Sequence, residues 1–170
     1  LVTTDQGIIP IEQLNTSINT INKKSIEYIT KTISNSSELV KIKKNALDDN
    51  IPNKDLILTK NHLVKVKKIK INSNLLPELN NKSYFINNNM LVIEKDAFSK
   101  NNPKNNCYIN VKKNQILIIK DWIIEAYKLT KINDNVINIK YNNEILYNIL
   151  LKDYQFINIQ NVMTETLHPD

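Results

Sequence analysis

The chain's two histidines are the side chains best suited to proton transfer, because imidazole is the side chain whose ordinary pKa lies nearest neutral pH. His62 is the more informative of the two. It follows Thr59 by three residues, just after the apolar run Leu56–Leu58. Where a strand meets a turn, this spacing lets the hydroxyl hold a backbone amide while the imidazole donates a proton to its nitrogen. A histidine that only caps a turn gives the same T-x-x-H pattern, so the pattern alone leaves both interpretations open.

The other reactive side chains point less clearly to catalysis. His168 stands near the end of the sequence, where we expect a solvated side chain, and Cys107 lies in an apolar run typical of a small buried residue. Asp48, Asp49 and Asp153 lack the spacing of metal ligands, and one cysteine is too few for a multi-cysteine zinc site. We therefore expect neither a metal nor a cofactor.

The composition is that of an ordinary globular chain with one domain: 170 residues, 41% hydrophobic and 24% charged. The formal net charge is +6, and the chain contains lysine but no arginine. Lysine lacks the planar fork with which arginine grips phosphate. The lysines are also spread over a chain rich in asparagine and isoleucine, so we expect no nucleic-acid partner.

We expect neither a membrane span nor a disulfide. No apolar run approaches the roughly 18 residues that a transmembrane helix needs, and the opening residues form neither a basic leader nor an apolar signal-peptide run. The single cysteine allows no intramolecular disulfide, which fits a reducing intracellular compartment. Stability should therefore come from packing.

Short runs of alternating apolar and polar residues predict strands. These runs are Ser25–Ile33, Leu39–Lys43, Leu56–Thr59, Val64–Val66, Met90–Glu94, Ile116–Ile119, Val136–Lys140, Glu144–Leu151 and Phe156–Ile159. Three short helical segments are expected, at Ile11–Leu14, Asn74–Leu79 and Trp122–Leu129. With Gly7 as the only glycine, asparagines should take the left-handed turn positions, at 49–53, 87–89, 101–106 and 142–143. The sequence thus predicts an all-β protein with more than a third of its residues in strands.

Residues 39–70 and 90–120 suggest an internal repeat. When segments 39–58 and 90–109 are aligned, they share five identities, more than this biased composition gives by chance. Continued with a two-residue slip, the alignment places His62 opposite Gln115, so the second copy could not transfer protons. Two copies are too few for a solenoid, and we expect a single domain over residues 1–170.

Several stretches, taken in order, resemble the Hint (Hedgehog/intein) domain family. Residues 1–14, LVTTDQGIIPIEQL, are similar to the start of that domain just after its nucleophile: a short strand, a glycine turn and an I-P-I-E-x-L stretch. Thr59-x-x-His62 falls where the family has its T-x-x-H motif. Residues 145–157, ILYNILLKDYQFI, resemble its late strand pair, and residues 165–169, ETLHP, are similar to the end of Hint domains of large DNA viruses. The resemblance spans nearly the whole chain.

This resemblance implies a self-processing domain with a pseudo-symmetric β fold of long hairpins. In this family a Cys or Ser attacks the carbonyl of the preceding peptide bond, and the (thio)ester is resolved by water, a sterol or a second nucleophile. By this resemblance, His62 would protonate the departing amide nitrogen and Thr59 would hold the scissile amide, with Thr3 beside the nucleophile's loop. The implied partner is the chain's own N-terminal flanking domain. The implied location is the host cytoplasm or a virion.

The sequence also departs from the family's patterns. The family's nucleophile precedes the position of Leu1, so we expect an upstream Cys or Ser and no reaction from residues 1–170 alone. Inteins end in His-Asn, but residues 162–166 read VMTET, so splicing and C-terminal cleavage are not expected. Sterol transfer is not expected either, because residues 29–33 lack the aspartate that Hedgehog-type domains place upstream of T-x-x-H. Tyr154 stands where the late strand pair often carries a histidine.

Three functions are therefore in competition. The leading hypothesis is cleavage of the peptide bond at an upstream Cys or Ser by an acyl shift. The first alternative is an inactive relic of the same fold that serves as a structural or interaction module. The second is a basic β domain that binds nucleic acid through several phosphate contacts, which would make its affinity depend on salt.

Overall fold

The computed structural model describes residues 1–71, 75–80, 84–87, 90–93, 106–110, 115–131 and 133–167, and the side chains of 1–66, 123–131 and 133–167. Strands dominate these ranges and cover more than a third of the sequence, as the alternating runs predicted. The longest helix described is α1 (Ala126–Leu129), and η1 (Ile11–Gln13) is a single 3₁₀ turn. The all-β class is confirmed. Within the described ranges, no helix is long and apolar enough to cross a membrane.

Each of the nine predicted runs overlaps a strand, and β13 and β15 have the predicted bounds. The described strands are β1 (Val2–Thr4), β2 (Gly7–Ile9), β3 (Thr20–Ile21), β4 (Lys24–Thr32), β5 (Glu38–Ile42), β6 (Leu56–Leu58), β7 (Leu63–Ile71), β8 (Leu75–Asn80), β9 (Tyr84–Asn87), β10 (Met90–Ile93), β11 (Asn106–Asn110), β12 (Gln115–Glu125), β13 (Val136–Lys140), β14 (Leu146–Leu151), β15 (Phe156–Ile159) and β16 (Val162–Glu165). Periodicity alone missed β1, β2, β3, β8, β9, β11 and β16, which are short or lack clear alternation.

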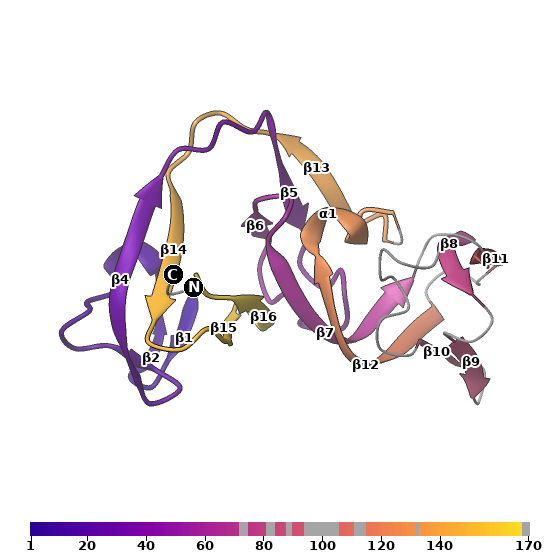
Figure 1. The fold of residues 1–170 in the computed structure, drawn as a ribbon, viewed down its shortest axis with the longest axis horizontal. Coiled ribbons are helices and arrows are strands. Elements are labelled where there is room, and N and C mark those ends of the chain that lie inside the picture. The colour runs from indigo at the N-terminus through magenta and orange to yellow at the C-terminus, as the bar shows by residue number, and fades with distance from the viewer. Residues whose placement is uncertain are drawn as a thin grey trace.

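Most of these strands belong to three sheets. Eight form one sheet in the order β2-β1-β15-β16-β7-β12-β10-β9, whose neighbours are antiparallel except for β10 and β12. Two three-stranded sheets have the orders β13-β5-β6 and β14-β4-β3. Figure 1 shows β4 running on into β5, and β13 into β14, over an arch between these two sheets. The two chain segments pair antiparallel on both sides of the arch, β14 with β4 and β13 with β5.

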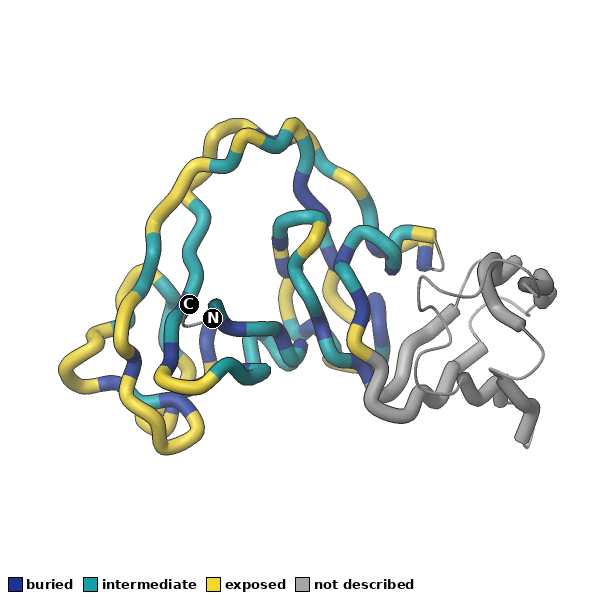
Figure 2. Tube along the Cα trace, viewed as in Figure 1, coloured by how far each residue is buried: buried dark blue, intermediate teal, exposed yellow. Residues whose placement is uncertain are grey.

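The apolar core is divided between two lobes. The larger lobe has α1, β5, β6, β7, β13, β16 and the end of β12 around thirteen buried residues: Val40, Ile42, Ala46, Leu47, Leu56, Leu58, Val64, Val66, Ile124, Ala126, Leu129, Val136 and Val162. The smaller lobe has β1, β3, β4, β14 and β15 around six: Val2, Ile21, Ile26, Ile149, Leu151 and Ile157. Figure 2 shows buried segments on both sides of the arch. Ile159 of β15 packs against both cores, so the β15–β16 hairpin joins the lobes.

Tyr141 fastens the two chain segments that form the arch. Its hydroxyl donates to the Glu144 carbonyl at 2.8 Å and accepts from the Ser34 N–H at 3.0 Å. Its own N–H donates to the Ser37 carbonyl at 3.0 Å. The ring is 8% exposed, so these bonds are sheltered from water and hold one connection against the other.

Turns in this chain are made almost without glycine. Two hairpins use two-residue loops with positive φ at both residues: Asn22 and Lys23 between β3 and β4, and Gln160 and Asn161 between β15 and β16. These are the backbone angles of a type I′ turn, which usually needs Asn-Gly. The predicted asparagine turns at 49–53 and 142–143 are confirmed by φ of 61° at Asn50 and at Asn143. Residues 88–89 and 101–105 lie outside the described ranges.

Two of the three helical predictions fail in part or whole. The helix predicted at Asn74–Leu79 is wrong. Leu75–Asn80 is strand β8, which pairs with β11, and Asn74 lies outside the described residues. Trp122–Leu129 is helical only in α1, because its first residues continue β12, where β-branched isoleucines favour a strand. Pairing with neighbouring strands outweighs weak local helix preference in both places. Much of the second copy of the predicted repeat, 90–120, lies outside the described residues, so the repeat stays a prediction.

Candidate functional site

A pocket of about 360 Å³ lies between the two lobes. Leu1, Val2 and Asn148 line it from the smaller lobe, and Thr59 and His62 line it from the larger. The two site residues predicted from the sequence therefore share one pocket with the first residues of β1 and with the late strand β14. Thr3 is exposed on β1 and is not among the residues that line this pocket, and Leu151 of β14 belongs to the core of the smaller lobe.

The Thr59–His62 turn is fixed by main-chain hydrogen bonds. β6 ends at Leu58 and β7 begins at Leu63, so the turn is short. The His62 N–H donates to the Thr59 carbonyl at 3.2 Å, and the His62 carbonyl accepts from the Ala126 N–H at 2.9 Å. The start of α1 therefore holds the backbone of His62, and the larger lobe gives its imidazole a rigid base.

The imidazole of His62 has a defined partner. Its Nε2 lies 3.2 Å from the carbonyl oxygen of Glu165, on β16. A carbonyl oxygen can only accept, so this hydrogen bond requires the proton on Nε2. In neutral His62, Nδ1 is then the ring nitrogen that can take up a proton and give it away again.

Glu165 is a site residue that the sequence analysis did not single out. Its carboxylate accepts from the Leu63 N–H at 2.9 Å and from the Tyr154 hydroxyl at 2.8 Å. Tyr154 stands where the late strand pair of the Hint family often carries a histidine, but nothing in the sequence indicated that its phenol would contact this carboxylate. The contact depends on the register of the β15–β16 hairpin, which pairs Phe156 with Glu165.

Burial and charge set the protonation states of the site. Burial lowers the pKa of His62 below its ordinary 6.5, while the Glu165 carboxylate and carbonyl oppose that shift. His62 is therefore neutral at pH 7 and able to accept a proton. Burial, together with the hydrogen bond to Glu165 and its charge, raises the pKa of Tyr154 to about 12. The phenol thus stays protonated at pH 7 and donates to the carboxylate.

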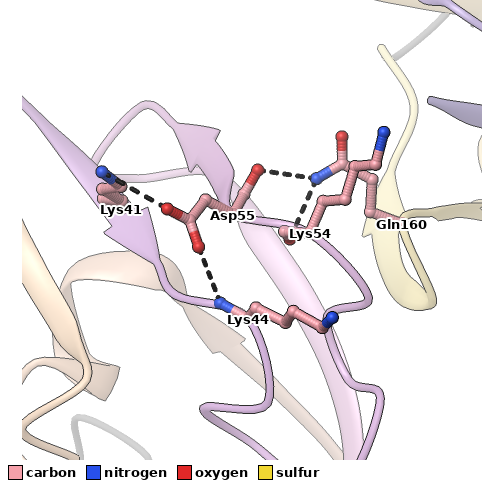
Figure 3. Close-up of polar contacts among 5 residues, drawn as sticks. All are labelled: Lys41, Lys44, Lys54, Asp55 and Gln160. Atoms are coloured by element: carbon pink, nitrogen blue, oxygen red, sulfur yellow. Dashed lines mark hydrogen bonds and ion pairs between the residues drawn. The ribbon is translucent and has the colours of Figure 1, made fainter.

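Gln160 ties Leu1 to the loop before β6, a second contact that the sequence analysis missed. Its side-chain oxygen accepts from the Leu1 nitrogen at 3.0 Å, and its main-chain N–H donates to the Leu1 carbonyl at 3.1 Å. Its side-chain nitrogen donates to the carbonyls of Lys54 at 3.1 Å and Asp55 at 2.8 Å (Figure 3). The β15–β16 turn therefore anchors the start of β1 beside the segment that leads to Thr59.

Asp55 holds the same loop to the larger lobe. Its carboxylate accepts from the Lys44 N–H at 2.8 Å and lies 3.4 Å from the Lys41 ammonium (Figure 3). The hydrogen bond from Lys44 is the main reason why the pKa of Asp55 is lowered. Leu1, which lines the pocket, is in this way connected to β5 through Gln160 and Asp55.

The remaining sequence candidates lie away from this pocket or outside the described side chains. Asp48 forms a bridge with Ile51 on the wall of a separate pocket. Cys107 lies on β11 opposite Leu79, and its side chain and all of His168 are outside the described set. Among the described side chains, no group of three or more His, Cys, Asp or Glu residues is placed to hold a metal ion.

Comparison with known proteins gives no relative. No protein-family model, no curated protein and no solved structure matches the chain.

Proposed function

We propose that this chain is a Hint-like self-processing domain that cleaves the peptide bond before an upstream Cys or Ser. The observation that carries the proposal is that the His62 imidazole and the first residues of β1 line one pocket between the lobes. The T-x-x-H turn supplies the proton-transfer group, and β1 supplies the chain that leads back to the scissile bond. The implied partner is the domain that precedes this chain.

The proposed reaction takes place in the pocket between the lobes. The thiol or hydroxyl of the upstream residue attacks the carbonyl carbon of the peptide bond before it, and a tetrahedral oxyanion forms. The carbon–nitrogen bond then breaks, and the nucleophile's own amine leaves as its thioester or ester remains. Neutral His62 takes the nucleophile's proton at Nδ1 and returns it to the departing nitrogen. Thr59 holds the scissile amide, and water or an added thiol resolves the (thio)ester.

The strand connections also favour a Hint-like fold for this chain. Two long segments, β4–β5 and β13–β14, pass antiparallel to one another from lobe to lobe, as expected for a fold of two related halves joined by long hairpins. The late pair β14 and β15 lies beside β1 and β4, so the segments that resemble the beginning and end of the family's domain meet in the smaller lobe.

The proposal is tested by restoring the upstream segment of the gene product with its Cys and a flanking domain. Cleavage should occur at that Cys and accelerate when a thiol is added, and replacing the Cys by Ala should abolish it. An upstream segment that has neither Cys nor Ser, or a restored chain that stays intact with thiol, would contradict the proposal and favour the inactive relic.

A further inference from the structure

Glu165 contacts the T-x-x-H turn through two different groups. Its main-chain carbonyl lies 3.2 Å from Nε2 of His62, and its carboxylate accepts from the N–H of Leu63 at 2.9 Å. One residue of β16 therefore holds both the imidazole and the peptide that follows it. The proposed reaction uses no atom of Glu165, so its contacts require an explanation of their own.

We propose that Glu165 is the positioning residue for His62, which keeps the proton on Nε2 and turns Nδ1 toward the reacting bond. This inference rests on the proposed function, because it names how the proton-transfer group of that reaction is held. Glu165 itself does not contact the reacting atoms in this proposal, and it acts only through His62.

The turn is held from three directions. The carbonyl of Thr59 binds the N–H of His62, the N–H of Ala126 binds its carbonyl, and the Glu165 carboxylate binds the N–H of the next residue, Leu63. The backbone therefore leaves the imidazole little freedom except rotation of the side chain, and the Glu165 carbonyl fixes that rotation through Nε2. Without this carbonyl, either ring nitrogen could carry the proton.

Tyr154 holds the carboxylate in turn. Its hydroxyl donates to Oε2 of Glu165 at 2.8 Å, while Leu63 donates to Oε1, so each carboxylate oxygen has a separate donor. The Tyr154 ring also packs edge to face against Phe156, with 6.0 Å between the ring centroids. Such a fully engaged carboxylate is a fixed support and not a mobile surface charge.

The other charged groups around the turn are engaged elsewhere. Lys60 pairs with Glu38 at 2.9 Å, and Lys128 pairs with Glu125 at 3.6 Å. Glu144, which also lines the pocket, accepts from the Asn142 N–H at 2.9 Å. Glu165 is therefore the carboxylate whose charge acts on His62, as its opposing effect on the pKa of His62 indicates.

Nuclear magnetic resonance of residues 1–170 labelled with ¹⁵N-histidine tests the inference, because the chain has two imidazoles and His168 serves as a reference. In the unaltered chain, neutral His62 should carry its proton on Nε2. Glu165→Gln should keep that tautomer and lower the pKa of His62, since the negative charge is lost while the acceptor for Leu63 remains. Glu165→Ala keeps the main-chain carbonyl but loses the carboxylate that holds the turn against β16, so the contact to Nε2 should loosen and part of the His62 population should carry its proton on Nδ1. Glu38→Gln is the matched control, because Glu38 contacts the same turn through Lys60, and it should change neither property.

In the restored chain, Glu165→Ala should slow cleavage roughly 10-fold to 10²-fold, which is the size of effect expected from misplacing a catalytic group. The inference is wrong if the unaltered chain carries the proton on Nδ1, or if His62 in Glu165→Gln titrates as in the unaltered chain. The second result is decisive even if Glu165→Ala does not fold. If the resonance results hold but the restored chain never cleaves, the proposed function fails and the positioning contact stands.

Discussion

The two lobes differ in the size of their cores and in what they contribute to the pocket between them. The larger lobe surrounds thirteen buried apolar residues and contributes the T-x-x-H turn, with Thr59 and His62. The smaller lobe surrounds six and contributes the start of β1 and strand β14. In the proposed function, the side chain that transfers the proton is thus on the larger core, while the segment that would lead to the scissile bond is on the smaller one.

This difference makes the connections between the lobes important. Three residues of the late hairpin region span them: Ile159 packs on both cores, Gln160 binds Leu1 and the loop before β6, and Glu165 binds the T-x-x-H turn and Tyr154. The proposed self-processing site would span both lobes and would need such ties, because a displacement of about 1 Å between reacting groups can cost 10²-fold in rate. The β15–β16 hairpin is therefore as much a part of the site as the T-x-x-H turn.

The largest expected effect on stability comes from matched core substitutions, one in each lobe. Leu47 and Leu151 are both fully buried, in the larger and the smaller core respectively. Leu47→Ala should lower the free energy of unfolding by about 3–5 kcal/mol, and Leu151→Ala by about 2–3 kcal/mol, because the smaller core can collapse more readily into the space left behind. Denaturant unfolding followed by circular dichroism and by fluorescence of Trp122, on β12, gives both values.

The same experiment shows whether the lobes unfold together. Because Ile159 packs on both cores, Leu151→Ala should shift the Trp122 transition as much as the circular dichroism transition. If Leu151→Ala shifted the circular dichroism transition but left the midpoint of the Trp122 fluorescence transition unchanged, the two lobes would unfold independently. The tie through the late hairpin would then be too weak to align the site.

The strands were predictable where burial follows an alternation of apolar and polar residues, as in β7, where Val64 and Val66 are buried and Lys65 between them is only partly buried. The short strand β16 was missed although Val162 and Thr164 are buried, because four residues with one hydroxyl among the buried positions carry little periodic signal. The error at Asn74–Leu79 came from reading leucines at helical spacing where pairing with β11 decides the structure.

A smaller effect is expected from the contact that anchors Leu1. Gln160→Ala removes three side-chain hydrogen bonds, to Leu1, Lys54 and Asp55, but leaves the main-chain bond to Leu1. It should lower the free energy of unfolding by about 1–2 kcal/mol, since the freed groups can bind water, and it should slow cleavage in the restored chain. Denaturant unfolding and the cleavage rate measure the two effects.

Gln155→Ala provides the control for this substitution. The Gln155 side chain contacts Asn22 and Asp153, both within the smaller lobe. Gln155→Ala should lower the free energy of unfolding without slowing cleavage. Equal slowing of cleavage by the two substitutions would argue against a specific role for the contact between the lobes.

The smallest effect expected is on the pH dependence of stability. The pKa of His62 is lower in the folded chain than its ordinary 6.5, so below that pH the unfolded chain binds more protons. The free energy of unfolding should therefore fall as the pH drops below 6.5, and His62→Gln should remove about 1 kcal/mol or less of that fall. Urea unfolding at pH 7 and at about pH 5.5 measures this difference. Parallel behaviour of the two proteins would show that folding does not lower the pKa of His62.

The candidate site was predictable from the sequence only in part. The pair Thr59 and His62 has a spacing that marks a strand-to-turn junction, and both residues line the pocket with Leu1. Glu165 and Gln160 could not be found in this way. They act through contacts with His62, more than 100 positions away along the chain, and with Leu1 at its far end, and these contacts exist only once the late hairpin pairs with β1 and β7.

The cleavage rate of the restored chain in its His62→Ala form tests the central claim most directly, with His168→Ala as the control that removes the other histidine. If His62 transfers the proton to the departing nitrogen, His62→Ala should cleave roughly 10²-fold to 10⁴-fold more slowly, and His168→Ala should cleave at the unaltered rate. An undiminished rate in His62→Ala would show that another group protonates the amine, and the role given to the pocket between the lobes would be wrong.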